Sequence, residues 1–332
     1  MEHHFADLLD RANDYWTITP NRERWRHHFD DLNDAPPDTC RLTLTKDDKN
    51  WRKALDLAHL TELTLHKPDQ NQLAALPDFP PLKALRISHA RPASLAMLAG
   101  QPALRELVLE YVSRVDDLAP VGALPSLTAL HLENLRGVSD FSALAGARAL
   151  RCLTIYGTLD WNQPVQSLDF LAALGNLEHL QFGFGVRLLS PFPLTVLPAS
   201  PKLREISIPM DLLPLEEFAW IEANLPHVSG AIQPACNRSD PNDRKIRPDD
   251  YRAKLPLEEF SKLSGVYVGP DGARYERARH EALLLGKGNR CVYGAKEAVD
   301  AKCRAHEEKY RQLVQQCRQE LPPDSSSRSA YS

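Results

Sequence analysis

The chain has little cysteine, no long apolar run and no recognisable secretion signal. Six cysteines lie scattered at positions 40, 152, 236, 291, 303 and 317, without the density of a domain held together by disulfides. No stretch approaches the roughly 18 apolar residues that a membrane span requires. The start MEHHFADLLDRAND lacks a cationic region followed by an apolar one. These absences predict a cytoplasmic protein, with secretion by a signal-less route left open.

Neither sign of charge dominates the sequence. It has 40 Lys and Arg against 44 Asp and Glu, a formal net charge of -4. Nucleic acids and anionic membranes attract strongly positive surfaces. We therefore expect neither of them to be a partner.

Catalytic motifs are also missing. The sequence contains no Gly-x-Ser-x-Gly, His-Glu-x-x-His or Cys-x-x-Cys motif. The turn Gly286-Lys287-Gly288-Asn289 lacks the spacing of a phosphate-binding loop and is typical of a hairpin. We expect a protein that is not an enzyme and that needs no cofactor.

What the sequence does have is a repeat, in which a leucine is followed by apolar residues three and five positions later. The middle residues advance by 22, 22, 23, 23, 27 and 26 positions. This period is typical of leucine-rich repeats, in which each unit contributes one short strand to a stacked solenoid. The copies are Leu60/Leu63/Leu65, Leu82/Leu85/Ile87, Leu104/Leu107/Leu109, Leu127/Leu130/Leu132, Leu150/Leu153/Ile155, Leu177/Leu180/Phe182 and Leu203/Ile206/Ile208.

A second apolar pattern lies between the predicted strands. Apolar residues stand nine and six positions before the next opening leucine, as Leu73 and Leu76 do before Leu82. A spacing of three favours short 3-10 or α segments with one buried side. Each repeat should therefore supply apolar groups to both walls of one core.

The segments VDDLAPVGALPSLTAL and VSDFSALAGARALRCL resemble bacterial leucine-rich-repeat proteins of the internalin-like, short-repeat kind. The resemblance covers about residues 41–230. It implies an α/β fold, with a curved parallel sheet on the concave face and short helices and 3-10 turns on the convex face. It also implies that the concave face binds a partner.

The sequence departs from this family at one position. The family usually has Asn or Cys eight residues after the opening leucine, where its side chain bonds backbone groups of the turn. Here these positions hold Pro68, Ala90, Val112, Leu135, Thr158, Gly185 and Asp211. The turns must therefore satisfy their backbone groups by another route. In addition, no cysteine has the Cys-x-Asp motif of the ubiquitin ligases that some bacterial relatives carry.

Five segments are expected along the chain. Apolar stripes that include Phe5, Leu9 and Trp25 predict a helical N-terminal cap over 1–40. The solenoid should occupy 41–230, beginning with an atypical strand at Leu42 and Leu44 and including a helix at 214–225. A linker or long loop over 231–254, a small α/β appendage over 255–320 with a long final helix, and a disordered tail over 321–332 should follow.

Candidate binding residues lie on the predicted concave face. Strand side chains alternate, so residues two, four and six after each opening leucine should point away from the core. We expect Glu106, Glu110 and Glu133 to form an acidic patch there that suits a partner with a basic surface. The candidate residues are Glu62, Arg86, Glu106, Glu110, His131, Glu133, Tyr156, His179, Gln181 and Glu205.

A weak metal-site candidate lies in the appendage. Cys303 and His306 are three residues apart on one predicted helix face, and Cys291 precedes them. A zinc site normally pairs two closely spaced ligand couples, which this set lacks. We favour packing cysteines and a surface histidine, and expect no metal.

The sequence therefore predicts a non-catalytic solenoid that binds a protein partner through its concave face. Two roles fit, an antitoxin-like immunity protein and an adaptor or effector. The alternative is an enzyme or metal-binding activity in the C-terminal appendage.

Overall fold

The structure is a computed structural model that describes residues 9–12, 15–18, 27–194, 197, 200–239, 243–277, 280–288 and 291–320. The chain divides into two compact units. The solenoid unit comprises Met1–Leu212 with Leu225–Ala231, and the C-terminal unit comprises Leu213–Asn224 with Ile232–Ser332.

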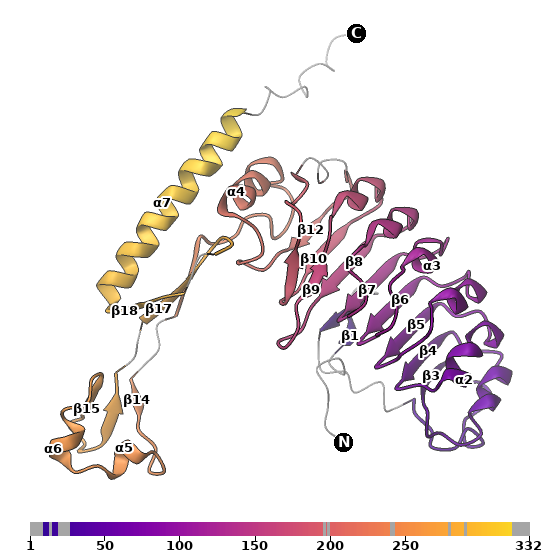
Figure 1. Ribbon diagram of the computed structural model, residues 1–332, viewed down its shortest axis with the longest axis horizontal. Helices are drawn as coiled ribbons and strands as arrows, with labels where there is room; N and C mark the ends of the chain where they lie inside the picture. Colours follow the sequence, from indigo (N-terminus) through magenta and orange to yellow (C-terminus); the bar gives the residue numbers. More distant parts are fainter. Residues whose placement is uncertain are drawn as a thin grey trace, which may run out of the picture. The chain divides into compact units, whose positions relative to one another are not determined.

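Eight parallel strands form the main sheet of the solenoid unit, in the spatial order β12, β10, β8, β7, β6, β5, β4, β3. The repeats are in register, since Leu63 lies opposite Leu85 and Leu85 opposite Leu107. Figure 1 shows the strands stacked along the inner side of an arc. The strands are β3 (Arg41–Thr45), β4 (Glu62–His66), β5 (Ala84–Ser88), β6 (Glu106–Glu110), β7 (Ala129–Glu133), β8 (Cys152–Tyr156), β10 (His179–Phe182) and β12 (Glu205–Ser207).

Short helical segments follow the strands and line the outer side of the arc (Figure 1). Leu95 and Leu98, from the second apolar pattern, are buried as completely as Leu85 and Leu107 of the strands. The predicted leucine-rich-repeat solenoid with a core between two walls is confirmed. The segments are η2 (Trp51–Asp56), α2 (Gln70–Ala74), η3 (Leu76–Asp78), η4 (Ala96–Gly100), α3 (Ala119–Gly122), η5 (Ser142–Gly146) and η6 (Asp169–Ala173).

Neighbouring outer segments approach each other closely at Gly122, the last residue of α3. A Cβ atom at this position would lie 2.1 Å from the backbone oxygen of Ala143 in η5. Only glycine leaves room for this approach of two backbones.

Two buried glutamines satisfy backbone groups in the turns of neighbouring repeats. The amide nitrogen of Gln101 donates to the backbone oxygens of Leu76 at 2.9 Å and Phe79 at 3.3 Å, and its oxygen accepts from the Leu82 amide at 2.9 Å. Gln163 likewise accepts from the Leu135 amide and donates to the Val138 oxygen, both at 2.8 Å. Each glutamine thereby links two successive repeats, and Gln163 supplies the alternative route in the turn after β7.

Four strands are followed by a residue with left-handed backbone. Lys67, His89, Tyr111 and Asn134 have φ between 51 and 54°. Each amide donates to a backbone oxygen at the end of the next strand, as His89 does to Glu110 at 3.0 Å. The left-handed conformation is unfavourable for a residue other than glycine. In return, each of these residues adds one backbone hydrogen bond beyond the end of its strand.

The structure corrects the prediction of a helical cap over 1–40. In the described part of that range, β1 (Leu9–Ala12) and β2 (Tyr15–Ile18) form an antiparallel pair, with Leu9 opposite Ile18. Residues 27–32 run beside β3, and His28 forms a parallel bridge with Thr43. The sequence Tyr-Trp-Thr-Ile has high β propensity, which the expected helical stripe did not take into account.

The C-terminal unit contains two small antiparallel sheets and a long helix. One sheet comprises β13 (Cys236–Ser239), β17 (His280–Leu284) and β18 (Val292–Gly294), and the other comprises β14 (Arg244–Lys245), β15 (Val266–Val268) and β16 (Arg274–Glu276). The final helix is α7 (Lys296–Glu320), which packs against α4 (Leu215–Asn224). The Tyr310 hydroxyl of α7 donates to the Phe218 oxygen of α4 at 3.4 Å.

Several predictions for this region need correction, while others are confirmed. The predicted linker 231–254 contains β13, β14 and α5 (Tyr251–Lys254), and α6 (Leu257–Phe260) follows it. The helix at 214–225 forms, but it belongs to the C-terminal unit and not to the solenoid. The hairpin between β17 and β18 and the long final helix are confirmed. The tail 321–332 lies outside the described residues.

We predict that Gln101→Leu destabilises the solenoid unit by about 2–4 kcal/mol, because three buried backbone groups lose their partner. Gln70→Leu is the matched control. The side-chain amide of Gln70 also donates to a backbone oxygen of the next repeat, that of Arg91 at 3.0 Å, but this bond is exposed to solvent. The control should cost less than about 1 kcal/mol. Urea melts of both variants measure the difference, and equal costs would contradict the role of Gln101.

Candidate functional site

The candidate binding residues occupy the predicted columns of the sheet. His131 lies opposite Thr154, and Glu133 lies opposite Glu110 on one side and Tyr156 on the other. His179 and Glu205 are directly opposite each other on β10 and β12. The strand register therefore brings these side chains into neighbouring rows.

The structure corrects the expectation that these side chains all face solvent. Glu110 and Glu133 are 0% exposed and Arg86 is 1% exposed, and His131 and Tyr156 are also buried. Glu62, Glu106, His179 and Gln181 are half-buried, and Glu205 is exposed. The acidic patch expected from Glu106, Glu110 and Glu133 is thus mostly covered.

The N-terminal strand pair explains part of this burial. Strand β2 contacts β7. Both edges of β7 are paired, with β6 and β8, and its leucines Leu130 and Leu132 face the core. The concave side is the only side of β7 left for this contact, and Figure 1 shows β1 there.

Arginine and histidine side chains lie beside the buried carboxylates. The Arg86 Nε donates to Glu110 Oε1 at 2.6 Å. The His131 Nε2 lies 3.5 Å from Glu133 Oε2, which is too long for a good hydrogen bond. One of the two buried carboxylates is therefore closely paired with a permanent cation, and the other is not.

Aromatic and imidazole rings line the same part of the face. The rings of His89 and Tyr111 stack at 4.8 Å between centroids, and those of His131 and Tyr156 stack at 5.6 Å. Burial and the negative charge of Glu133 raise the pKa of Tyr156 to about 12. The same two causes raise the pKa of Tyr111. These rings provide flat apolar surface next to the buried carboxylates.

The concave face is more open at β10 and β12. His179 Nδ1 lies 3.2 Å from Glu205 Oε2, and Gln181 Nε2 donates to the Tyr156 hydroxyl at 2.7 Å. Near the other end of the sheet, Arg41 pairs with Glu62 at 3.2 Å. Five of the ten candidate residues thus form a buried group on β5–β8, Glu106 of β6 is half-buried, and the other four lie toward the ends of the sheet.

The inserted loops of the two long repeats form a structure that the sequence did not predict in detail. β9 (Gln163–Val165) and β11 (Val186–Leu188) pair in parallel as a second, two-stranded sheet. The loops leading into these strands expose Leu159 by 92% and Phe184 by 37%. The Phe184 ring meets Tyr156 edge-on at 6.1 Å, so this exposed apolar surface adjoins the concave face.

Glycine at position 183 makes room for Tyr156. A Cβ atom there would lie 1.9 Å from Cδ1 of the tyrosine ring. In the sequence, Gly157 and Gly185 are the signals of close backbone approach in these loops, since a Cβ atom at Gly157 would lie 1.9 Å from the Gly185 oxygen. Gly183 therefore helps to position the ring between His131 and Phe184.

The structure does not assemble the weak metal candidate. Cys303 is buried with Cys236, Ala282 and Val299, and the Cys236 thiol donates to the Cys303 backbone oxygen at 3.6 Å. His306 Nε2 donates to the Leu285 oxygen at 2.9 Å. Across the described ranges, no three His, Cys, Asp or Glu side chains are grouped so that they could hold a metal ion.

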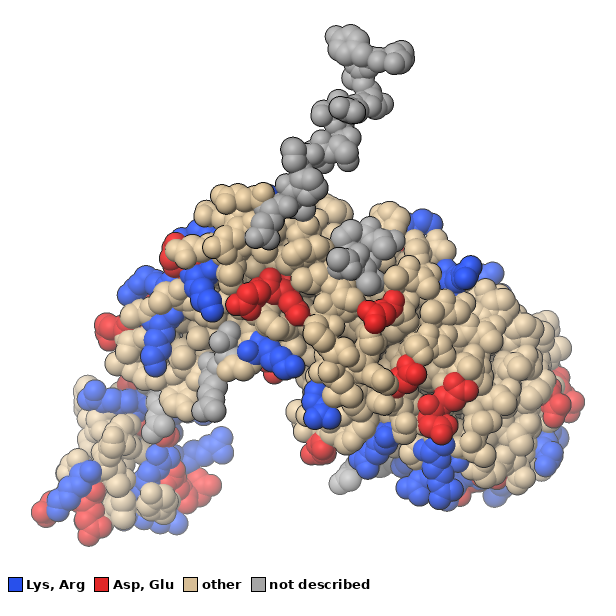
Figure 2. All heavy atoms as spheres, turned by 45° about the horizontal axis from the view of Figure 1, so that its top comes forward, with Lys and Arg blue, Asp and Glu red and all other residues tan. Residues whose placement is uncertain are grey.

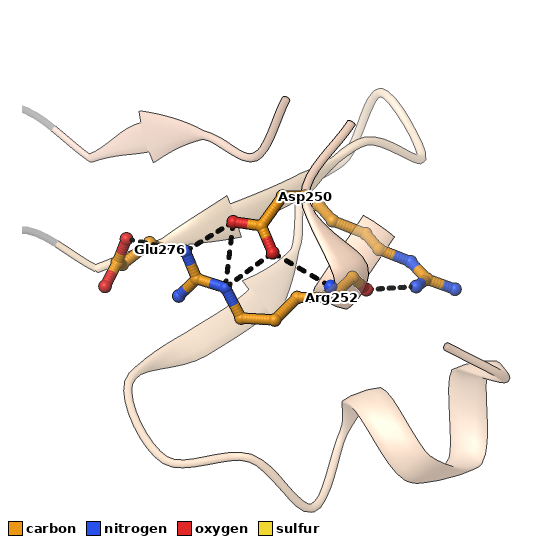
Figure 3. Close-up of polar contacts among 4 residues, drawn as sticks. Asp250, Arg252 and Glu276 are labelled. Carbon is orange, nitrogen blue, oxygen red and sulfur yellow. Dashed lines mark hydrogen bonds and ion pairs between the residues drawn. The ribbon is translucent and has the colours of Figure 1, made fainter. Parts of the chain in front are cut away.

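A polar cluster in the C-terminal unit has a structural explanation. Asp250 caps α5 by accepting from the Arg252 amide at 2.9 Å, and its carboxylate also binds the Arg252 guanidinium at 2.8 Å. Glu276 of β16 approaches the same guanidinium at 3.3 Å (Figure 3). Arg274 donates to the backbone oxygens of Arg252 and Leu255, both at 2.6 Å. These bonds tie the short helices to the sheet.

Charged side chains of both signs are interspersed on the face of the C-terminal unit seen in Figure 2. Within the described ranges, no helix is long and apolar enough to cross a membrane.

Solved structures that are similar to part of the chain include two internalins. The chain is similar to an internalin, InlF, of Listeria monocytogenes, with 20% identity, 52% of this chain and 47% of that chain covered, and a TM-score of 0.39. It is also similar to internalin C2 of the same species, with 18% identity, 57% and 68% covered, and a TM-score of 0.33. The chain thus spans less than half of the InlF structure. No protein-family model and no curated protein sequence matches the chain.

The stacked strands and the 22- to 27-residue period themselves define the class. The chain has the fold of a leucine-rich-repeat solenoid.

We predict that Gly183→Ala lowers the stability of the solenoid unit by about 1–3 kcal/mol, because the added methyl group displaces the packed Tyr156 ring. Gly175→Ala is the control, since its added Cβ would meet nothing within 4 Å. Thermal melts compare the variants. Equal melting temperatures would contradict the positioning role of Gly183.

Proposed function

We propose that the chain is a non-catalytic binding protein that recognises a protein partner through the open part of its concave face and the adjoining inserted loops. The observation that carries this proposal is the exposure of Leu159 and Phe184 beside β8 and β10. When a partner covers such exposed apolar side chains, their surface is removed from water, and this favours binding.

The inserted loops are well suited to present these side chains. The β9–β11 pair fixes their far ends, and the Gly157 amide donates to the Phe184 oxygen at 3.0 Å. Loops held in this way lose little conformational entropy on binding. His179, Gln181 and Glu205 would supply the polar rim that protein interfaces have around an apolar centre.

Protein, and neither nucleic acid nor membrane, is the proposed partner. The net charge of -4 gives no general attraction for polyanions. All six cysteines are free, which is typical of proteins in a reducing compartment, so we propose the cytoplasm as the place of action.

Two cellular roles are consistent with stoichiometric binding by a bacterial solenoid of this kind. An antitoxin-like immunity protein would occlude the active surface of a toxin, whereas an adaptor or effector would leave its partner active. An assay of the captured partner's activity distinguishes the two roles, because only the immunity protein would inhibit it. An enzyme in the C-terminal unit is less well supported, because Cys291, Cys303 and His306 are not grouped and the Asp250 cluster has a structural role.

We predict that Leu159→Glu with Phe184→Ser weakens binding of the natural partner at least about tenfold, since interface centres tolerate charge poorly. Native-lysate capture followed by mass spectrometry identifies the partner, and titration with that purified partner measures its affinity.

The matched control is Tyr293→Ser, which removes a 67% exposed aromatic residue from the C-terminal unit. The control should bind as the wild type does. A loop variant that keeps its circular dichroism spectrum and its full affinity would rule out these loops as the binding surface.

A further inference from the structure

Glu133 is a buried carboxylate without adequate compensation. It is 0% exposed, and neither of its carboxylate oxygens has a hydrogen bond of normal geometry in the structure as described. The Tyr111 hydroxyl interacts with Glu133, which raises the pKa of Tyr111, but this hydroxyl is neutral and does not balance the charge. The nearest basic atom that the structure describes is His131 Nε2, at 3.5 Å. Burying a carboxylate away from water without a close partner destabilises the folded chain, whether the group stays charged or takes up a proton.

The surroundings of Glu133 suit a cationic side chain. Glu110 lies opposite it on the next strand and adds a second carboxylate. Arg86 and Arg41 are the Arg residues in the concave columns of the described strands, and they are bonded to Glu110 and Glu62. The Tyr156 ring stacks on His131 beside the carboxylate, and Lys or Arg stems pack favourably on such rings.

An extended segment already lies on this face. Strand β2 contacts β7 from the concave side, so the surface accommodates a chain in β conformation. The poorly compensated charge of Glu133 lies beneath that cover and lowers its stability. A segment that brings a cation to Glu133 would replace this cost with a charge-assisted hydrogen bond.

We infer that the concave face around Glu133 binds an extended segment of a protein partner that places an Arg or Lys side chain against Glu133, and that this segment takes the place of β1 and β2. The inference rests on the proposed function and adds the chemistry of the partner to it. The inserted loops would contact the same partner beside this segment.

The first test uses the free full-length chain. Glu133→Gln should raise the midpoint of thermal unfolding by at least about 2 °C, because it removes a buried carboxylate that lacks a partner. Glu106→Gln, at a half-buried glutamate of the adjacent strand, should not raise the midpoint. A lower midpoint for Glu133→Gln would show that the chain itself uses this charge, and would overturn the inference.

The second test measures partner chemistry with an array of twelve-residue synthetic peptides. Each peptide is present in two forms. The natural form contains at least one Arg or Lys, and the substituted form has every Arg and Lys replaced by Gln. The wild-type chain should retain natural peptides at least tenfold more strongly than their substituted forms, and Glu133→Gln should abolish this difference. Retention that ignores the substitution, retention that survives Glu133→Gln, or no retention at all would each overturn the inference.

The loop variant separates the two proposals. If Leu159→Glu with Phe184→Ser weakens binding of the natural partner and Glu133→Gln does not, the inference fails and the proposed function stands. If neither variant changes partner binding, the proposed function fails as well.

Discussion

The in-register stacking of parallel strands is the constraint on which the solenoid unit depends. Leucines at equivalent positions, such as Leu85 and Leu107, lie opposite each other and exclude water from one continuous core. Because strands are held about 4.8 Å apart by their backbone hydrogen bonds, every other part of a repeat must fit that spacing. The bridging glutamines, the left-handed turn residues and the close approach at Gly122 all serve this fit.

Regular stacking also fixes what can lie on the concave face. Side chains in one column repeat at the strand spacing, so charges of one sign in a column repel each other unless they are paired. Arg86 pairs with Glu110 at 2.6 Å and His179 with Glu205 at 3.2 Å, whereas the nearest basic atom to Glu133 among the described residues lies at 3.5 Å. Charges on this face are thus well paired at Arg86 and Glu110 and at His179 and Glu205, and least well paired at Glu133, beneath β2. Such a mismatch is easier to explain by a surface used for binding than by folding alone.

The sequence was sufficient to predict the repeated strands, because burial of Leu63 or Leu130 follows from a local pattern repeated many times. The positions of the candidate residues in columns followed from the same register. Burial of Glu110 and Glu133 was not predictable in this way. Part of it follows from the contact of β7 with β2, more than a hundred positions away in the sequence. There a helical stripe competed with the β propensity of Tyr-Trp-Thr-Ile. Gln101 and Gln163 were also missed, because neither occupies the position at which the family places its asparagine.

The glycine at the end of α3 has a consequence for the shape of the sheet. A stack of repeats curves when the distance between neighbouring outer segments is larger than the distance between neighbouring strands. At Gly122 the outer backbones come close enough for direct contact, which keeps the local difference between the two spacings small. The middle repeats should therefore form a shallow trough. Such a trough accommodates a straight, extended chain more readily than a strongly convex partner.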